Sequence, residues 1–307
     1  MKYGHILQAF TSSVWAIEED KLAEIARVLA LRSSGDTMSA EDIHAAIASR
    51  GTPSVAPAGR GVAVIPIRGV IAHRMGAFDE SSGGASAEAI GRMLSQVAND
   101  DAIGTVIYDV DSPGGTITGI SELAGKMFAL RGQKKQIAQV NGLAASAAYW
   151  LASQCDEIVC LPSGRAGSIG VFTVHADTSG ALEKAGVKMT ILSAGEYKVE
   201  GNPFEPLSEE ARAFIQGQVD AAYAQFVKDV ARGRGVSVAD VKNGYGQGRA
   251  LDAKAAKAAG LVDRIEMFDD TLARVLGRSG ASLKAEDALS LTNDAYESDL
   301  RRRIEGF

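Results

Sequence analysis

The sequence predicts an α/β protein with a mostly parallel sheet and a helical extension at its N-terminus. From residue 62 onward, short runs rich in Val and Ile alternate with segments of helical periodicity, which is the pattern of βα units. Parallel strands joined in this way require right-handed crossovers. A long amphipathic segment at residues 208–232 and the helical pattern of the first 50 residues complete the prediction.

Residues 1–50 are expected to form the helical extension. Residues 16–31 carry apolar side chains at helical spacing, with acidic residues in the first turn. Residues 39–42 resemble a capping box, which predicts a second short helix that ends near Arg50. Residues 51–60 are rich in Pro, Gly and Ser and are expected to be a linker. The apolar positions of the first helix are Ile17, Leu22, Ile25 and Leu29.

Residues 61–277 are expected to form the domain that contains the sheet, and residues 278–307 a polar C-terminal tail. We expect strands at residues 62–71, 105–110, 136–140, 157–161, 169–174 and 187–192. We expect helices at residues 122–130, 144–153, 181–185 and 208–232. Ser208 and the glycines after Arg232 give the last of these helices a start and a stop.

Composition is that of an ordinary globular protein. The chain has 307 residues, of which 46% are apolar and 23% charged, so it can bury a sizeable core. Its net charge of −6 offers no basic face of the kind that nucleic acids require, and we expect no nucleic-acid partner. Cys155 and Cys160 form neither a CxxC pair nor part of a metal set, so we expect buried, reduced thiols.

We expect no membrane partner and a cytoplasmic location. The longest apolar run, residues 61–72, contains Pro66 and Arg68 and falls short of the ~20 residues that a spanning helix needs. The N-terminus has a broken apolar patch followed by an acidic run, which is unlike a signal peptide.

Three turns rich in Gly, Ser and Ala follow predicted strands. Residues 111–115 (DSPGG) place two adjacent glycines where backbone N–H groups can approach a ligand. Residues 141–149 (NGLAASAAY) place Ser146 among small residues at a predicted helix start, where developing negative charge is favoured. Residues 166–171 (AGSIGV) form the third turn. Each turn alone is also compatible with ordinary packing, and Lys198 with a solvated surface residue.

Taken together, these motifs resemble the signal peptide peptidase A family of serine peptidases. The matching pieces, in the family's order, are DSPGG (111–115), NGLAASAAY (141–149), GSIGVF (167–172) and GEYKVEGNPF (195–204). The resemblance implies a ClpP/crotonase-like fold of stacked βα units over residues 62–264. It does not extend to the N-terminal helices or to the C-terminal tail.

The resemblance implies a Ser–Lys dyad that needs no cofactor and no metal. Ser146 would be the nucleophile, Lys198 the general base, and Ser168 would hydrogen-bond Lys198 and orient it. A serine hydroxyl is a weak nucleophile until a base takes its proton. A lysine can do so only when neutral, so burial has to lower its pKa from ~10.4 toward ~7–8. Tyr197 and Phe204 could desolvate the amine, since they precede and follow it closely in the chain.

The resemblance also implies an oxyanion hole. The backbone N–H groups of Gly115 and Ala147 would form it, and Gly114 would shape the first turn. The family usually has glycines after the serine, where this chain has Ala147 and Ala148. We expect the alanines to narrow the site without blocking attack.

Three other interpretations of the site remain open. His175 follows a predicted strand and could serve as base in place of Lys198, although no motif supplies it with a triad partner. A crotonase-type acyl-CoA enzyme would use a similar oxyanion hole but would need a carboxylate and no Ser–Lys pair. A catalytically inactive assembly protein would have no reason to keep Ser146 and Lys198.

The expected partners are a polypeptide substrate and further copies of the chain in a homo-oligomeric ring. The N-terminal extension and the segment IRGVIAHRM (67–75) resemble the bacteriophage branch of the family, whose members process capsid or scaffold proteins during head maturation. The alternative is a cytoplasmic bacterial peptidase that degrades peptides.

The apolar stripe of residues 208–232 is broad enough to contact a neighbouring subunit, although it could also be wholly internal core. Its members are Phe214, Ile215, Val219, Ala222, Tyr223, Phe226 and Val230.

Overall fold

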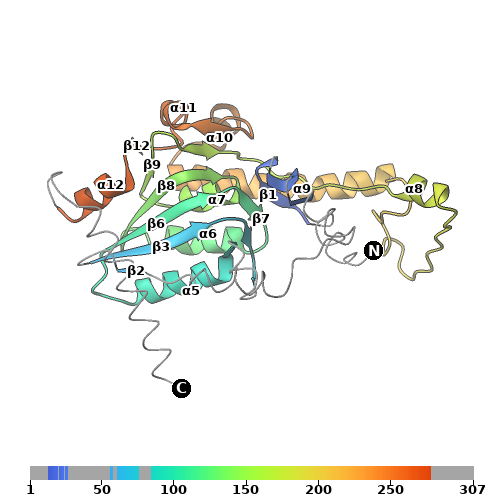
Figure 1. Cartoon of the computed structure of the whole chain (residues 1–307), viewed down its shortest axis with the longest axis horizontal. Coiled ribbons are helices and arrows are strands. Elements are labelled where there is room, and N and C mark those ends of the chain that lie inside the picture. The colour runs from blue at the N-terminus through green and yellow to red at the C-terminus, as the bar shows by residue number, and fades with distance from the viewer. Residues whose placement is uncertain are drawn as a thin grey trace, which may run out of the picture.

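The computed structural model describes residues 13–19, 21–23, 25–26, 56–57, 61–75 and 84–277. Within these ranges the chain forms two sheets and a set of covering helices (Figure 1). The predicted second helix at residues 39–50 and the C-terminal tail at residues 278–307 lie outside the described residues.

The larger sheet contains the expected parallel strands. Its order is β11-β10-β8-β6-β3-β2, with β9 pairing with β8, and β12 with β9. The pairings β3–β6, β6–β8, β8–β9, β8–β10 and β9–β12 are parallel, and the antiparallel ones lie at the edges, at β2 and β11. The mostly parallel α/β prediction is therefore confirmed. The strands are β2 (Ala56–Pro57), β3 (Val62–Arg68), β6 (Thr105–Ser112), β8 (Lys135–Ala145), β9 (Glu157–Cys160), β10 (Arg165–Gly167), β11 (Ala250–Asp252) and β12 (Arg264–Ile265).

Strand β8 changes partner along its length, which brings its end to the functional turns. Its first part pairs with β9 from Ile137 to Val140, and its last part pairs with β10 from Leu143 to Ala145. The register between β6 and β8 shifts after Val110. Such an irregularity bends a strand and redirects the residues after it. The sequence pattern predicted only the first part, because none of residues 141–145 (NGLAA) is β-branched or aromatic.

The smaller sheet has the order β1-β7-β4-β5 and continues from the carboxyl ends of β3 and β6. β4 pairs in parallel with β5 and β7, whereas β1 pairs antiparallel with β7. The strands are β1 (Trp15–Ile17), β4 (Ile71–Ala72), β5 (Ala85–Ser86) and β7 (Gly114–Thr116).

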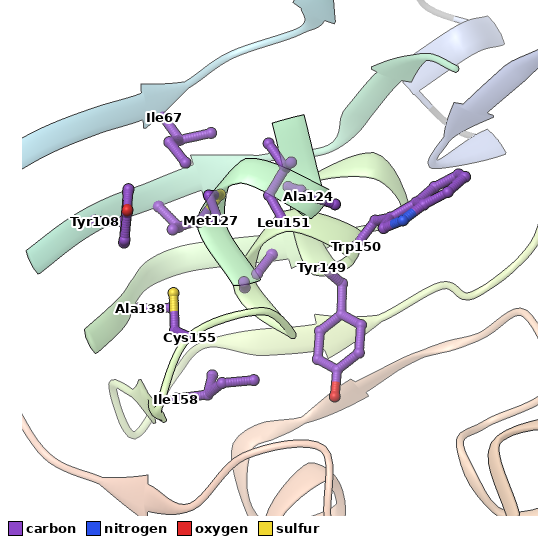
Figure 2. Packing of buried hydrophobic residues seen from close by; sticks show 14 of the residues in the cluster. Ile67, Tyr108, Ala124, Met127, Ala138, Tyr149, Trp150, Leu151, Cys155 and Ile158 are labelled. Carbon is purple, nitrogen blue, oxygen red and sulfur yellow. The ribbon is translucent and has the colours of Figure 1, made fainter. Parts of the chain in front are cut away.

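Helices cover both faces of the larger sheet. Successive residues of β6 point to opposite faces, so Val106, Tyr108 and Val110 join the main core whereas Ile107 joins a second cluster with Leu272 of α12. The main core is formed with α5, α6, α7 and the end of α9, and Figure 2 shows its closely packed centre. The helices are α5 (Ala87–Ala98), α6 (Ile120–Ala129), α7 (Ala147–Ala152), α8 (Ser179–Lys184), α9 (Glu209–Arg234), α10 (Val238–Gly244), α11 (Ala253–Ala258) and α12 (Phe268–Val275).

The start and the stop of the long helix α9 agree with the sequence. The Ser208 hydroxyl accepts a hydrogen bond from the Ala211 N–H at 3.1 Å, which satisfies a donor of the first turn. Gly235 ends the helix at φ 67°, a conformation that costs glycine little.

The N-terminal segment differs from the prediction. Ala16 and Ile17, expected in a helix, lie in strand β1, and the helical residues follow at 19, 21–23 and 25–26. Pairing with β7, which lies far along the chain, determines the extended conformation of residues 15–17. The spacing of apolar residues within the segment cannot reveal such a distant partner. Two expected strands are also missing: residues 187–192 form none, and of residues 169–174 only Phe172 makes an isolated bridge, to Trp15.

Residues 174–215 extend from the body as an arm (Figure 1). It consists of α8, the connection to α9 and the first part of α9, and its apolar side chains are widely exposed. In the stripe of α9, Phe226 and Val230 are buried whereas Phe214 is 58% exposed. The interpretation of that stripe as wholly internal core is therefore wrong. The exposed apolar residues of the arm are Val174, Val187, Met189, Ile191, Leu192, Tyr197, Phe204 and Phe214.

Candidate functional site

Ser146 lies on a sharp turn between β8 and α7. β8 ends at Ala145, α7 begins at Ala147, and Ser146 has backbone angles φ 57° and ψ −118°. A residue with a Cβ is strained at positive φ, so the surrounding structure has to hold it there. The Ser146 N–H donates to the Gly167 carbonyl at 2.8 Å, and the Ser146 carbonyl accepts from the Trp150 N–H at 2.9 Å.

Helix α7 is fixed by its own buried side chains, and it fixes Ser146 in turn. All six of its residues are buried, and Figure 2 shows Tyr149 and Trp150 pointing away from each other into the structure. The Tyr149 hydroxyl donates to the Leu261 carbonyl at 2.9 Å. Trp150 stacks on Phe226 of α9 with ring centroids 4.4 Å apart, and its Nε1 donates to Asp229 Oδ2 at 3.0 Å.

The turn with two glycines lies against Ser146. Gly114 has φ 100°, and a Cβ placed on it would lie 3.0 Å from the Cβ of Ser146. A Cβ on Gly115 would collide with the backbone of Ile71 on the neighbouring strand. Only glycine fits at either position, which explains the pair in physical terms. The Ser112 hydroxyl braces the turn, since it donates to the Gly69 carbonyl at 2.6 Å and accepts from the Gly114 N–H at 3.2 Å.

The third turn closes the other side of Ser146. Ser168 is a second non-glycine residue at positive φ, 54°, and its N–H donates to the Arg249 carbonyl at 2.9 Å. Two residues on, the Gly170 carbonyl accepts a hydrogen bond from Ser146 Oγ at 3.3 Å. The pairing of Ala145 with Gly167 places the second and third turns side by side. The structure therefore brings together Ser146, Ser168, Gly114, Gly115 and Ala147.

The structure does not bring Lys198 to this site within one chain. Lys198 lies on the arm, with its side chain exposed, and its N–H donates to the Gly195 carbonyl at 3.2 Å. Ser146 is fully buried. In the part of the chain that the structure describes, no hydrogen bond joins Lys198 to Ser146 or to Ser168.

Two other polar residues have structural partners. His175 Nε2 lies 3.2 Å from the carbonyl of Asn202, within the arm, and no described carboxylate hydrogen-bonds to its ring. Asp111 Oδ1 accepts from the Leu143 N–H at 3.2 Å. Asp111 therefore holds the chain just before Ser146 in place.

A cleft of about 650 Å³ opens beside the site. Ser168, Gly170 and Phe172 form one wall, and Ile17 and Leu22 of the N-terminal segment form the other. The lining is mostly apolar, so the cleft suits apolar side chains of a ligand.

Neither thiol belongs to the site. Cys155 and Cys160 are both free and buried, as expected. Burial raises the pKa of the Cys155 thiol far above its usual range, and that of Cys160 to about 11. Such thiols are inert at neutral pH. Among the described residues no cluster of His, Cys, Asp or Glu could hold a metal ion, and no helix is long and apolar enough to cross a bilayer.

The sequence analysis predicted no role for several residues that shape the site. Gly170, Phe172 and Arg249 act through backbone groups, which the residue type does not reveal. Asp229 stands in a polar helical segment and is nevertheless buried under Trp150. Ala16 lies in the site because of the pairing between β1 and β7.

Comparison with known proteins relates this chain to peptidases. A family model for peptidase family S49 matches residues 129–281. The head-tail preconnector protein GP5 of Enterobacteria phage P21 is 34% identical over 241 residues, which cover 78% of this chain and 44% of the phage protein. The capsid assembly protease C of Escherichia phage lambda is 31% identical over 271 residues, which cover 86% of this chain and 57% of that protein.

The serine protease SPPA of Arabidopsis thaliana chloroplasts is 27% identical over 205 residues, which cover 66% of this chain and 30% of the plant protein. The chain spans about half the length of the two phage relatives. The stacked βα units and the mostly parallel sheet are those of the ClpP/crotonase-like fold that family S49 has. Through residues 129–281, this chain belongs to peptidase family S49.

Proposed function

We propose that the chain is a serine endopeptidase in which Ser146 is the nucleophile and Lys198 the general base. The observation that carries the proposal is the strained turn at Ser146, which is held at φ 57° between β8 and α7 and faces the Gly114–Gly115 turn. Strain of this kind persists only where the surrounding structure enforces it, and it gathers at catalytic turns.

The arrangement supports acyl transfer. Ser146 Oγ attacks the carbonyl carbon of the scissile peptide bond and gives its proton to the neutral amine of Lys198. The N–H groups of Gly115 and Ala147 stabilise the oxyanion; Ala147 is the first residue of α7, where a helix has donors without intrahelical partners. The protonated lysine then passes the proton to the leaving amine, and water hydrolyses the ester to release the acyl group and restore the serine hydroxyl.

Lys198 reaches Ser146 from another copy of the chain in this proposal. An exposed lysine is charged at neutral pH and cannot act as base, so it has to be buried by a partner. The arm that carries Lys198 exposes apolar side chains that need such a partner, among them Leu192, which is 93% exposed. In a head-to-tail ring, the arm of one subunit would cover the Ser146 turn of the next. This contact would bury Lys198 and would also cover the exposed apolar side chains of the arm. Ser168, beside Ser146, is then placed to orient the incoming amine.

The proposed substrates are capsid or scaffold proteins of a bacteriophage, cut during head assembly in the host cytoplasm or inside the prohead. The names of the phage relatives support this proposal. A peptidase that acts on a cytoplasmic pool of peptides is the alternative, and the similarity to the serine protease SPPA of chloroplasts is compatible with it.

Labelling with a small fluorophosphonate tests the proposal directly. The reagent should attach to Ser146 of the wild-type chain, and Ser146→Ala should abolish both the label and hydrolysis of a protein substrate. Coexpression with the capsid and scaffold proteins of the same phage would then identify the substrate, since new fragments should appear with wild type and not with Ser146→Ala. A folded wild-type chain that takes no label would contradict the peptidase assignment.

A further inference from the structure

Strand β1 lies directly in front of the nucleophile, between two backbone edges. On one side Trp15, Ala16 and Ile17 pair antiparallel with Thr116, Gly115 and Gly114 of β7. On the other side the Trp15 N–H donates to the Phe172 carbonyl at 2.8 Å, and the Phe172 N–H donates to the Trp15 carbonyl at 2.9 Å. A strand that only completed the small sheet would use one edge, whereas β1 uses both.

The register places the carbonyl of Ala16 at the oxyanion turn. In an antiparallel pair, residues that exchange hydrogen bonds alternate with residues that do not. The Glu18 N–H donates to the Pro113 carbonyl at 2.9 Å, so Ala16 and Gly115 form the next exchanging pair on this edge. Trp15, beside Ala16, directs its polar groups to Phe172 instead. The Gly115 N–H, an expected oxyanion donor, therefore faces Ala16.

The surroundings of Gly114 independently place the Ala16 carbonyl next to Ser146. A Cβ placed on Gly114 would collide with the carbonyl oxygen of Ala16 and would lie 3.0 Å from the Cβ of Ser146. The Ala16 carbonyl and the Ser146 side chain therefore meet at one point. Both residues are fully buried, so no substrate can reach Ser146 while β1 is in place.

Extended peptides bind to exposed sheet edges by adding a strand, and β1 already has this arrangement. We propose that β1 occupies the peptide-binding groove of its own chain in the register of a substrate, with Ala16 just before and Ile17 just after the position of the scissile bond. The proposal rests on the peptidase function proposed above. The chain as folded is then self-blocked, and β1 has to leave the groove before a substrate enters.

Side chains and one ion pair hold β1 in the groove. Trp15 and Ile17 are buried in a small cluster with Leu22, and Phe172 packs against it. Glu18, just beyond the strand, forms an ion pair with Arg165 at 3.1 Å. This cluster is separate from the main core, to which β1 contributes only the small side chain of Ala16, so the strand can detach without unfolding the sheet.

Hydrogen exchange on the full-length wild-type chain tests the proposal. A peptidyl phosphonate with the sequence Val-Trp-Ala, matching residues 14–16, should attach to Ser146 and expel β1. The amides of Trp15 and Glu18 should then exchange on the order of a hundredfold faster, because their hydrogen bonds to Phe172 and Pro113 are lost. The amide of Leu276, which donates to Leu272 in α12, serves as the control and should not change.

Protected amides at Trp15 and Glu18 in a chain fully modified by the peptidyl phosphonate would overturn the proposal, while the peptidase function would stand. No modification of Ser146 by this reagent or by the small fluorophosphonate would overturn the peptidase function, and the groove assignment with it.

A matched pair of variants gives a kinetic test. Ile17→Ala weakens the cluster that holds β1, so the groove is free for a larger fraction of the time and the apparent KM for a peptide substrate should fall about tenfold. Leu272→Ala removes a similar buried side chain from the cluster around α12, away from the groove, and should leave KM unchanged. An unchanged KM in Ile17→Ala, or an equal fall in both variants, would overturn the proposal.

Discussion

At the residue scale, Ser146 combines a strained backbone with a side chain that contributes little to the fold. Its hydroxyl makes a 3.3 Å hydrogen bond to the Gly170 carbonyl, near the limit of useful length. Ser146→Ala should change the free energy of unfolding by less than about 1 kcal/mol, because alanine keeps the Cβ and the same strain. Hydrolysis of a peptide substrate should fall on the order of 10⁴-fold or more.

The same assay should include Lys198→Ala and the double variant. Nucleophile and base act as one unit, so Lys198→Ala should lose as much activity as Ser146→Ala, and the double variant no more. Ser168→Ala should lose less, because Ser168 only orients the amine. Near-wild-type hydrolysis in Lys198→Ala would exclude the dyad, and thermal unfolding of each variant provides the control for folding.

Gly115 and Gly125 form a matched pair for a second prediction. A Cβ on Gly115 would collide with the backbone of Ile71, which cannot rotate away as a side chain can. Gly115→Ala should therefore lower the free energy of unfolding by about 3 kcal/mol or more. Gly125, within α6, has no atom within 4 Å of such a Cβ, and Gly125→Ala should raise stability by about 0.5–1 kcal/mol. Thermal unfolding measures the stability of both variants. Equal changes in stability would show that the backbone of Ile71 can move away from residue 115.

The residues of the site that could be predicted from the sequence are those with a local backbone requirement. Gly114 and Gly115 have to be glycines for steric reasons, and Ser146 stands where small neighbours allow a tight turn. The sequence predicts a buried Lys198, whereas in the single chain this residue is exposed to solvent, and the proposed dyad needs a second copy of the chain to bury it. Ala16 had no signal of its own, since its role depends on a partner strand far along the chain.

At the element scale, Asp263 joins the connection between α11 and β12 to two other elements, β9 and α9. It accepts from the Ile158 N–H of β9 at 2.7 Å and from both Nη atoms of Arg234, at the end of α9, at 2.9 and 2.6 Å. Asp263 itself lies between α11 and β12. Partial burial alone would raise the pKa of this carboxyl, but the hydrogen bonds from Arg234 and Ile158 outweigh it and hold the pKa below its usual range.

This carboxylate should make stability depend on pH. Because its pKa is lower in the folded than in the unfolded state, it stabilises the fold at neutral pH. That contribution is lost as the pH falls from about 3.9, the unfolded value, through the lower folded value. Asp263→Asn should lower the free energy of unfolding by about 1–3 kcal/mol at pH 7 and by clearly less near pH 3. Chemical denaturation at the two pH values measures this, and an equal loss at both would contradict it.

Elements with a strong local sequence pattern were predicted well, whereas strands that depend on pairing with a distant segment were not. Helix α9 was placed correctly because Ser208 and Gly235 mark its ends chemically. The sequence predicts the start of a helix at β1 because Ile17 and Leu22 fit the apolar spacing of the helical residues that follow. The expected strand at residues 187–192 has the right residue types but no partner within the described chain, and without a partner a strand has nothing to stabilise it.

At the scale of the whole molecule, neither member of the proposed dyad is ready for catalysis in the single chain. Ser146 is covered by β1, and Lys198 is exposed on the arm. Self-association would place an arm over each Ser146 turn, bury the apolar surface around Leu192 and provide the base. Light scattering during size exclusion should therefore show a mass that is a multiple of 32.0 kDa, and a fully active monomer at high dilution would contradict the ring.

Mixing two inactive variants tests whether the site is shared between copies. Ser146→Ala retains Lys198, and Lys198→Ala retains Ser146, so neither chain alone has a complete dyad. If the arm of one subunit supplies Lys198 to the Ser146 turn of the next, a random equal mixture of the two variants contains both Ser146 and Lys198 at about a quarter of its sites. Reassembly of the mixture from dissociated subunits should therefore restore about a quarter of wild-type hydrolysis, while each variant reassembled alone stays inactive. If Lys198 instead folds back onto Ser146 of its own chain, every chain in the mixture lacks one group, and no activity returns at any mixing ratio.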